Sequence, residues 1–204
     1  EFYETLALHF SKGNSTIKAV NYFIKSGEKS LKRYSIEESL DYFQKGYDLL
    51  GTIQDRTPEI EEMTIDLLNR WALVIYYKGT FNELAKLLLS YEHLVENMED
   101  SEIKGMFITW QGFVSEFLGR YTEAEDLLMK AYKIGSRLNN QKMLGYACTW
   151  LTWVYCDLGK FKKGIEFGKK ANKIGKIITD DPYIYFKSLS GIGWNYLLSL
   201  SESI

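Results

Sequence analysis

The sequence predicts an all-α fold of stacked antiparallel helix pairs, and three observations support this prediction. First, three segments of the 204-residue chain align without gaps at a period of 40 residues. Second, apolar residues follow the repeated turns at the three- and four-residue spacing of an amphipathic helix. Third, the chain contains only 2 prolines, which favours long uninterrupted helices. A repeat of this length is typical of solenoids, in which neighbouring units share one continuous core.

The repeated segments share a glycine followed two positions later by an aromatic residue. The glycines Gly79, Gly119 and Gly159 fall where the first helix of each pair must end. A residue in the left-handed conformation ends a helix at least cost when it is glycine. The aromatic residues are expected to fill the space where the two helices of a pair meet. The aligned segments are 71–84, 111–124 and 151–164.

Start signals along the chain place the individual helices. A degenerate copy of the repeat is expected from Gly27, with Ser35 and Glu38 at the spacing of a capping box for its second helix. Pro58, after an interruption of the pattern, and Pro182 each begin a helix at its first position. Eleven helices are predicted, at 2–12, 16–25, 27–34, 36–51, 58–78, 81–97, 101–118, 121–138, 140–158, 161–178 and 182–200.

The pattern Leu-Gly-x-aromatic-x-x-small, which ends at Ala124 and Gly164, resembles the tetratricopeptide repeat (TPR). The resemblance implies a right-handed superhelical solenoid of about five and a half helix pairs. The 40-residue unit is longer than the typical repeat and is similar to the helical arms of bacterial signalling ATPases, nucleotide-cyclase fusions and maltotriose-type transcription activators. The chain is expected to be one domain, 1–204, within a larger multidomain protein. Its repeats are predicted at 2–25, 27–51, 58–97, 101–138, 140–178 and, in part, 182–204.

The sequence contains no catalytic, cofactor-binding or metal-binding motif, so we expect a protein that is not an enzyme. His9 and His93 are the only 2 histidines, and neither has a Cys or carboxylate at ligand spacing. Neither His-Glu-x-x-His nor Gly-x-Ser-x-Gly occurs. Cys148 and Cys156 would lie about 12 Å apart on one helix, beyond disulfide reach. Two unpaired thiols predict a reducing, cytoplasmic compartment.

Charge and hydropathy argue against nucleic-acid and membrane partners. The net charge of −2 provides no general attraction to polyanions. Seven lysines between positions 160 and 176 form a basic run, but they lack interleaved arginines and aromatics, and a solvated convex face is the expected explanation. No stretch of 18 apolar residues occurs. A protein or peptide partner, including neighbouring domains of the same chain, is therefore expected.

The resemblance also assigns the residues that would contact this partner. In TPR arrays the first helix of each pair lines a concave groove, and partners bind there. The groove would combine an aromatic ladder with a row of small polar residues, in a scaffold or regulatory arm that binds a peptide or partner domain. The assigned positions are Asn69, Leu73, Tyr76, Thr109, Phe113, Glu116, Tyr146, Thr149, Trp153, Lys187, Ser190 and Trp194.

Two interpretations of the aromatic ladder stay open at this stage. The aromatics of the ladder could anchor an amphipathic helix or an extended peptide. Alternatively Phe113, Trp153 and Trp194 could belong to the core of a tightly curled solenoid. An alternative function is a small-molecule sensing arm, in which an effector binds among Trp and Tyr side chains.

The remaining aromatic residues lead to two further expectations. Trp71, Trp110 and Trp150 recur near the repeat spacing and are expected in the core between helix pairs. The last predicted helix has no polar helix to close it, which would leave Tyr196 and Leu197 exposed beside Trp194. Self-association through this helix is therefore predicted.

Overall fold

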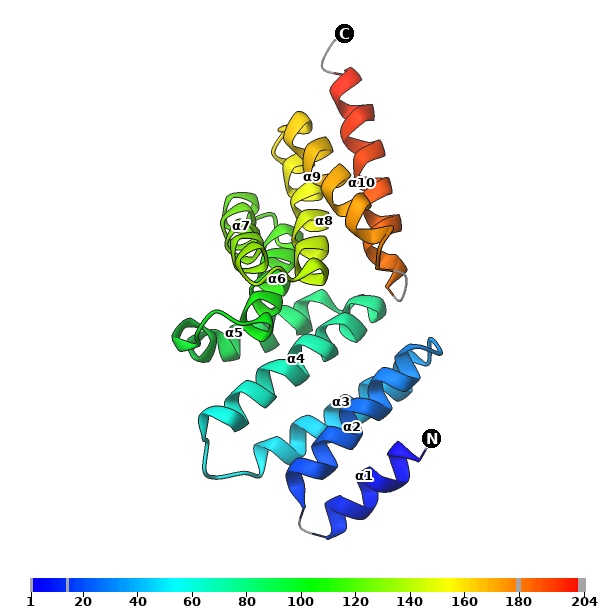
Figure 1. Ribbon diagram of the computed structural model, residues 1–204, viewed down its shortest axis with the longest axis vertical. Helices are drawn as coiled ribbons and strands as arrows, with labels where there is room; N and C mark the ends of the chain where they lie inside the picture. Colours follow the sequence, from blue (N-terminus) through cyan, green and yellow to red (C-terminus); the bar gives the residue numbers. More distant parts are fainter. Residues whose placement is uncertain (1, 14, 179–180, 202–204) are drawn as a thin grey trace. The chain divides into compact units, whose positions relative to one another are not determined.

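The computed structural model describes residues 2–13, 15–178 and 181–201, and all regular structure within them is helical (Figure 1). The limits 1 and 204 of the predicted domain, and the end of its last repeat at 202–204, lie outside the described residues. The helices are α1 (Tyr3–Lys12), α2 (Thr16–Leu31), α3 (Ile36–Gly51), α4 (Pro58–Lys78), α5 (Phe81–Asn97), α6 (Glu102–Phe117), α7 (Tyr121–Arg137), α8 (Gln141–Asp157), α9 (Phe161–Gly175) and α10 (Pro182–Ser201).

The helices form two compact units, 1–97 and 98–204. Within each unit consecutive helices pack against each other, and short connections make neighbouring helices antiparallel. In the second unit the backbone of α8 also packs against α6 and α10, whereas α7 and α9 meet only through side chains such as Tyr132 and Phe167, whose ring centroids lie 5.6 Å apart. Helices α6, α8 and α10 therefore form an inner row, and α7 and α9 an outer row. The predicted all-α fold of stacked helix pairs is confirmed.

Glycines end the first helices as predicted. Gly79, Gly119 and Gly159 have φ angles of +82°, +75° and +68°. No atom lies within 4 Å of the position that a Cβ would take at any of the three. The requirement for glycine is thus conformational, because a side chain in this left-handed region costs about 1 kcal/mol or more.

The predicted start of a new helix at Gly27 is wrong, because α2 continues through this residue to Leu31. Gly27 is buried on the side of α2 that faces α3, where a Cβ would lie 2.7 Å from Cε2 of Phe43. The glycine therefore permits close helix packing rather than ending a helix. As a result the described residues contain ten helices rather than eleven, and α2 pairs with α3 while α1 packs on α2.

The capping box predicted for Ser35 and Glu38 does not form, since the Ser35 side chain makes no capping hydrogen bond. Glu38 instead accepts a hydrogen bond of 2.9 Å from Ser30 on the preceding helix. The same contact recurs in the second unit, where Ser115 donates to Glu123 over 3.0 Å. In both units this bond ties the end of a first helix to the start of its partner.

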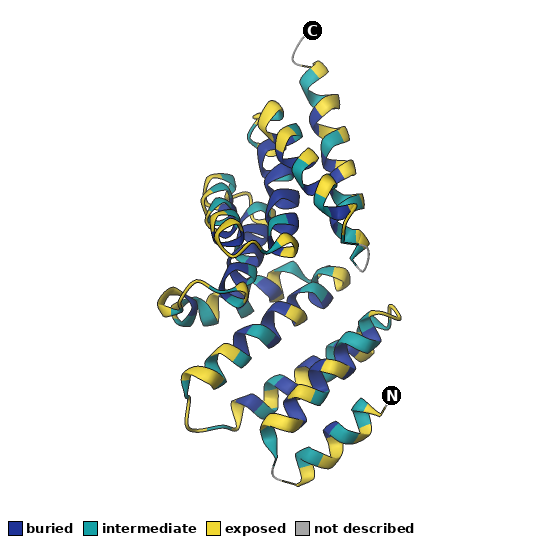
Figure 2. Cartoon of the chain, viewed as in Figure 1, coloured by how far each residue is buried: buried dark blue, intermediate teal, exposed yellow. Residues whose placement is uncertain are grey.

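The core of the second unit lies between the two rows of helices, and Figure 2 shows α8 buried along most of its length. Trp71 in the first unit and Trp110 and Trp150 in the second are buried, as predicted. Cys148 and Cys156 are buried free thiols, and burial raises the pKa of Cys148 to about 12. These thiols are therefore uncharged in neutral solution.

Candidate interaction surface

Five of the twelve predicted groove residues are buried: Asn69, Thr109, Phe113, Tyr146 and Thr149. The hydroxyl of Thr109 donates to the carbonyl of Gly105 over 2.8 Å, and that of Thr149 donates to Gly145 over 2.7 Å. Both bonds lie within their own helices. These hydroxyls are therefore directed into the helix backbone rather than toward a partner.

Phe113 and Tyr146 belong to an aromatic cluster that joins the three inner-row helices. The ring centroids of Phe113 and Trp150 lie 4.4 Å apart, and those of Tyr146 and Tyr183 lie 5.5 Å apart in a stacked arrangement. The Tyr146 hydroxyl donates to Oδ2 of Asp181 over 2.7 Å. For these two ladder residues the structure shows packing in the core.

The other predicted residues remain accessible to different extents. Leu73 and Tyr76 are half-buried on α4 of the first unit. In the second unit the accessible residues come from all three inner-row helices, and Trp194 is 48% exposed. We call this set the inner-row surface: Glu116 on α6, Trp153 on α8, and Lys187, Ser190 and Trp194 on α10.

A lysine covers the indole at the centre of the inner-row surface. Nζ of Lys187 lies 4.2 Å from the ring centroid of Trp153 and 5.3 Å from that of Trp150. The face of an indole attracts a cation at these distances. Burial lowers the pKa of Lys187, and the negative charge of Glu116 opposes this effect. The lysine thus lies over an aromatic face and within the electrostatic influence of the Glu116 carboxyl group.

Two carboxyl groups meet beside this lysine. Burial raises the pKa of Glu116 to about 7, and the charge of Asp157 and a hydrogen bond to it act in the same direction. Burial also raises the pKa of Asp157, which the hydrogen bond with Glu116 lowers again. Below about pH 7 Glu116 therefore holds a proton that it donates to the Asp157 carboxylate. In this state the pair has about one negative charge, next to the positive charge of Lys187.

The raised pKa of Glu116 predicts a pH-dependent stability of the second unit. Between the ordinary pKa of 4.5 and about 7, the folded chain holds a proton that the unfolded chain has released. The free energy of unfolding is therefore expected to fall as pH rises through this window, by at most about 1.4 kcal/mol per pH unit. Glu116→Gln should remove this slope in urea unfolding curves recorded from pH 4.5 to 7.5.

Glu102 on the same helix provides the control for this prediction. It is exposed and forms no ion pair with any described residue. Glu102→Gln should therefore keep the wild-type slope. An identical slope in wild type and Glu116→Gln would contradict the shared proton.

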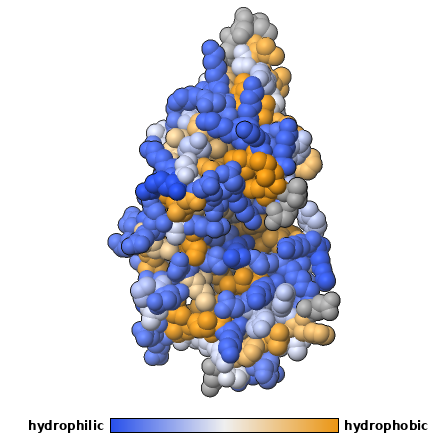
Figure 3. All heavy atoms as spheres, viewed as in Figure 1, coloured by the Kyte–Doolittle hydropathy of each residue, from blue (hydrophilic) through white to orange (hydrophobic). Residues whose placement is uncertain are grey.

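Helix α10 extends the inner-row surface with a broad apolar face. Lys187 is the only charged residue within this helix. Trp194, Tyr196 and Leu197 are exposed as predicted, and orange side chains interrupt the blue surface along α10 in the upper part of Figure 3. The exposed large apolar residues, which we call the α10 face, are Phe186, Leu189, Trp194, Tyr196, Leu197 and Leu200.

The spacing on α10 brings this face and the inner-row surface together. Lys187 and Trp194 are seven residues apart, so they lie on nearly the same side of the helix. Gly191, between them, packs against Trp153, since a Cβ there would lie 3.0 Å from Nε1 of that indole. Gly193 is exposed and has no atom within 4 Å of its Cβ position. Gly191 rather than Gly193 therefore permits the close packing of α10 against α8.

The predicted basic run lies on α9, in the outer row. Six of its seven lysines are exposed, in line with the expected solvated face. Lys160 pairs with Glu125 over 2.6 Å, and Lys170 pairs with Glu166 over 3.0 Å. Nζ of Lys170 also lies 4.5 Å from the ring centroid of Phe167. Part of the charge of this run is thus balanced within the chain.

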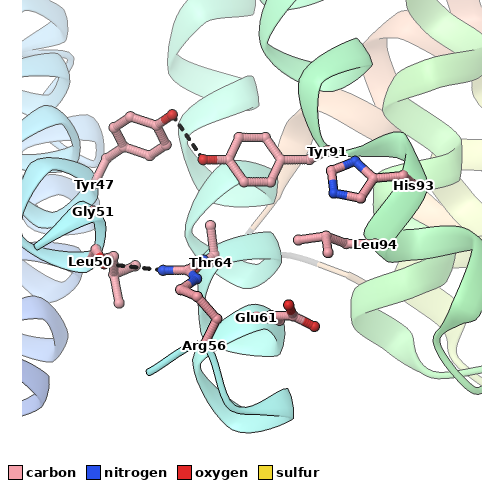
Figure 4. A pocket seen from close by; sticks show the side chains of 9 residues that line it. All are labelled: Tyr47, Leu50, Gly51, Arg56, Glu61, Thr64, Tyr91, His93 and Leu94. Atoms are coloured by element: carbon pink, nitrogen blue, oxygen red, sulfur yellow. Dashed lines mark hydrogen bonds between the residues drawn. The ribbon is translucent and has the colours of Figure 1, made fainter. Parts of the chain in front are cut away.

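A cavity of about 370 Å³ in the first unit was not predicted (Figure 4). It lies among α3, α4, α5 and the connection between α3 and α4, where the repeat pattern is interrupted. That interruption was the one sequence signal available, because the lining residues form no motif. They are Tyr47, Leu50, Gly51, Arg56, Glu61, Thr64, Tyr91, His93 and Leu94.

Comparisons with known proteins identify the fold. No family model and no curated protein matches the sequence. Among solved structures the chain is similar to BtubC (BKLC) from P. vanneervenii, with a TM-score of 0.69 and 13% identity over 97% of this chain and 78% of that chain. It also aligns with a MamA RS-1 ArsTM double mutant, with a TM-score of 0.48 and 16% identity over 90% of this chain and 96% of that chain. The similarity to BtubC concerns the fold alone and agrees with the helical-repeat architecture described above.

No helix in the described part of the chain is long and apolar enough to cross a membrane. No group of three or more His, Cys, Asp or Glu side chains in residues 2–13, 15–178 and 181–201 could bind a metal ion. The predicted cytoplasmic location stays a prediction.

Proposed function

We propose that the chain is a non-catalytic helical-repeat module that binds a protein partner through the α10 face and the adjoining inner-row surface. The observation that supports this proposal is the concentration of six large, exposed apolar side chains on one helix. Contiguous exposed apolar surface is typical of protein interaction sites, whereas isolated exposed apolar residues need no explanation.

In this proposal the α10 face provides apolar contacts and the inner-row surface provides a polar border. Trp194 and Leu197 lie at the centre of the α10 face and are suited to act as apolar anchors. Glu116, Asp157 and Lys187 form a polar border whose charges nearly cancel. We therefore propose an apolar partner segment, with an amphipathic helix as the simplest candidate. The α10 face of a second copy of the chain presents the same chemistry.

The TPR resemblance supports this kind of function without identifying the partner. The sequence repeat and the TPR-like fold agree, but similarity at 13% identity concerns the fold alone. We propose that the chain is an arm of a larger regulatory protein, in line with its resemblance to the arms of signalling ATPases, cyclases and transcription activators. Nucleic-acid binding has no place in this proposal.

Selection of helical peptides from a displayed library against the immobilised chain tests the proposal. The enriched peptides should have sequences that form an amphipathic helix with one apolar face. The double variant Trp194→Ser, Leu197→Ser should weaken their binding at least tenfold, because it removes two central anchors. Its unfolding free energy should change far less than on truncation of a core tryptophan, since both side chains are about half exposed.

The matched control carries the same chemical change at exposed apolar residues of the first unit. Leu8→Ser together with Leu89→Ser should leave peptide affinity unchanged, because neither residue belongs to the α10 face. Equal binding of the selected peptides to the wild type and the α10 double variant would contradict the proposal. A selection that enriches no peptide would contradict it as well. Sedimentation equilibrium of the same proteins tests the predicted self-association separately.

A second candidate function, the sensing of a small effector, is favoured by the cavity in the first unit. Its volume of about 370 Å³ is at the lower end of the range for small-molecule sites, and polar groups from several elements line it. In this case a ligand among α3, α4 and α5 would stabilise the first unit, as any ligand specific for the folded state does.

A further inference from the structure

The cavity in the first unit contains an arginine whose orientation is fixed by the fold. Nη1 of Arg56 donates to the carbonyl of Leu50 over 3.1 Å, and Nη2 donates to Oγ1 of Thr64 over 3.1 Å (Figure 4). Thr64 is buried and donates its own proton to the carbonyl of Ile60 over 2.7 Å. The guanidinium group is thus attached to the end of α3 and to α4.

Two hydrogen bonds leave most of the donors of this guanidinium available. An arginine side chain has five N–H donors, and no carboxylate of the described residues forms an ion pair with Arg56. Its fork of donors and fixed positive charge match a carboxylate. The cavity therefore contains an anchored cationic group with capacity for an anion.

An acidic group lines the same cavity at a separate position. Glu61 on α4 contributes to the lining, and it has no ion-pair partner among the described residues either. The Glu61 carboxylate and the Arg56 guanidinium group therefore lie more than 4.0 Å apart, which is the limit for an ion pair. Both side chains nevertheless line the same cavity. A purely anionic ligand would be repelled by the Glu61 carboxylate, whereas a ligand with both charges could satisfy both residues.

Apart from Thr64 and His93, the rest of the lining is aromatic and apolar. The Tyr91 hydroxyl donates to the Tyr47 hydroxyl over 2.8 Å, which leaves the Tyr47 proton available as a donor. Leu50 and Leu94 border the cavity next to these rings (Figure 4). This part of the lining is suited to an apolar side chain of a ligand whose charged groups meet Arg56 and Glu61.

We propose that this cavity binds a free amino acid with an apolar side chain, whose carboxylate pairs with Arg56 and whose ammonium group pairs with Glu61. The Tyr47 hydroxyl adds a donor to the carboxylate, and the rings with Leu50 and Leu94 contact the side chain. This inference specifies the ligand class of the second candidate function and depends on it. It does not depend on partner binding by the α10 face.

Calorimetric titration with three matched compounds tests this proposal at pH 7. L-leucine has both charges, N-acetyl-L-leucine has only the carboxylate, and L-leucinamide has only the ammonium group. L-leucine should bind at least tenfold more tightly than either blocked compound. Equal binding of N-acetyl-L-leucine, or of L-leucinamide, would overturn the proposal because one of the two charges would then contribute nothing.

Glu61→Gln provides a variant that should fold normally, since Glu61 forms no ion pair with any described residue. It should weaken L-leucine binding about tenfold and leave the affinity for N-acetyl-L-leucine unchanged or improved. Glu62→Gln, at an exposed neighbouring position outside the cavity lining, is the control and should not change either affinity. An equal affinity of wild type and Glu61→Gln for L-leucine would overturn the proposal.

Titration with inorganic phosphate distinguishes a failure of the amino-acid proposal from a failure of effector sensing, the function on which it depends. Phosphate binding that is lost in Arg56→Gln, without any binding of L-leucine, would overturn the zwitterionic ligand but preserve effector sensing. If neither L-leucine nor phosphate binds, both are overturned.

Discussion

Replacing Trp150 with alanine is expected to lower the free energy of unfolding of the second unit by about 3–5 kcal/mol. Trp150 is only 2% exposed and lies between Phe113, at 4.4 Å between ring centroids, and Tyr183, at 6.1 Å. Truncation would leave a cavity at the junction of the three inner-row helices, and these helices cannot close around it without losing their other contacts. Urea unfolding followed by circular dichroism at 222 nm measures the change.

Trp194→Ala is the matched variant for this prediction. The two tryptophans lie on inner-row helices of the same unit, but Trp194 is 48% exposed. Its truncation should cost less than about 1 kcal/mol. Similar losses of stability in both variants would contradict the assignment of Trp150 to the core and of Trp194 to the surface.

The second large effect is expected at Gly175, the last residue of α9. A Cβ at this position would lie 2.7 Å from the backbone nitrogen of Tyr185 and 2.8 Å from its Cα. A flexible side chain could rotate away, but backbone atoms of α10 can yield only if the helix moves. Gly175→Ala should therefore lower the free energy of unfolding by about 1–3 kcal/mol, the usual cost of overpacking.

Gly193→Ala tests the same substitution where space is open. Gly193 lies within α10 and has no atom within 4 Å of its Cβ position. Alanine is the better helix former by about 1 kcal/mol, so this variant should be more stable than wild type. The two Gly→Ala variants should thus shift the urea midpoint in opposite directions. A shift in the same direction would contradict the packing of α9 against α10.

The local signals in the sequence were sufficient for most of the fold. A glycine that ends a helix needs only its own backbone conformation, so Gly79, Gly119 and Gly159 could be identified from spacing alone. Gly27 could not be, because a glycine that allows close packing looks the same in sequence as one that ends a helix. Its role depends on Phe43, sixteen positions later, whose ring occupies the space a Cβ would take.

The candidate surface shows the same limit. Phe113 and Trp194 occupy corresponding positions in their repeats, yet Phe113 is 3% exposed and Trp194 is 48% exposed. Phe113 is covered by Trp150 of the next inner-row helix, whereas α10 packs against α8 and α9 on its other sides and no described helix covers Trp194. Repeat position alone could not reveal this difference. The cavity was missed since its lining combines residues from 47 to 94, which only the folded chain brings together.

The indole N–H resonances of the 5 tryptophans, recorded by NMR with and without a selected amphipathic peptide, test the proposed partner surface most directly. The account predicts shifts at Trp153 and Trp194, which lie on the inner-row surface and the α10 face. Trp71 is buried in the first unit and should not shift. Shifts confined to Trp71, or no shift at saturating peptide, would contradict the proposal that this surface binds the partner.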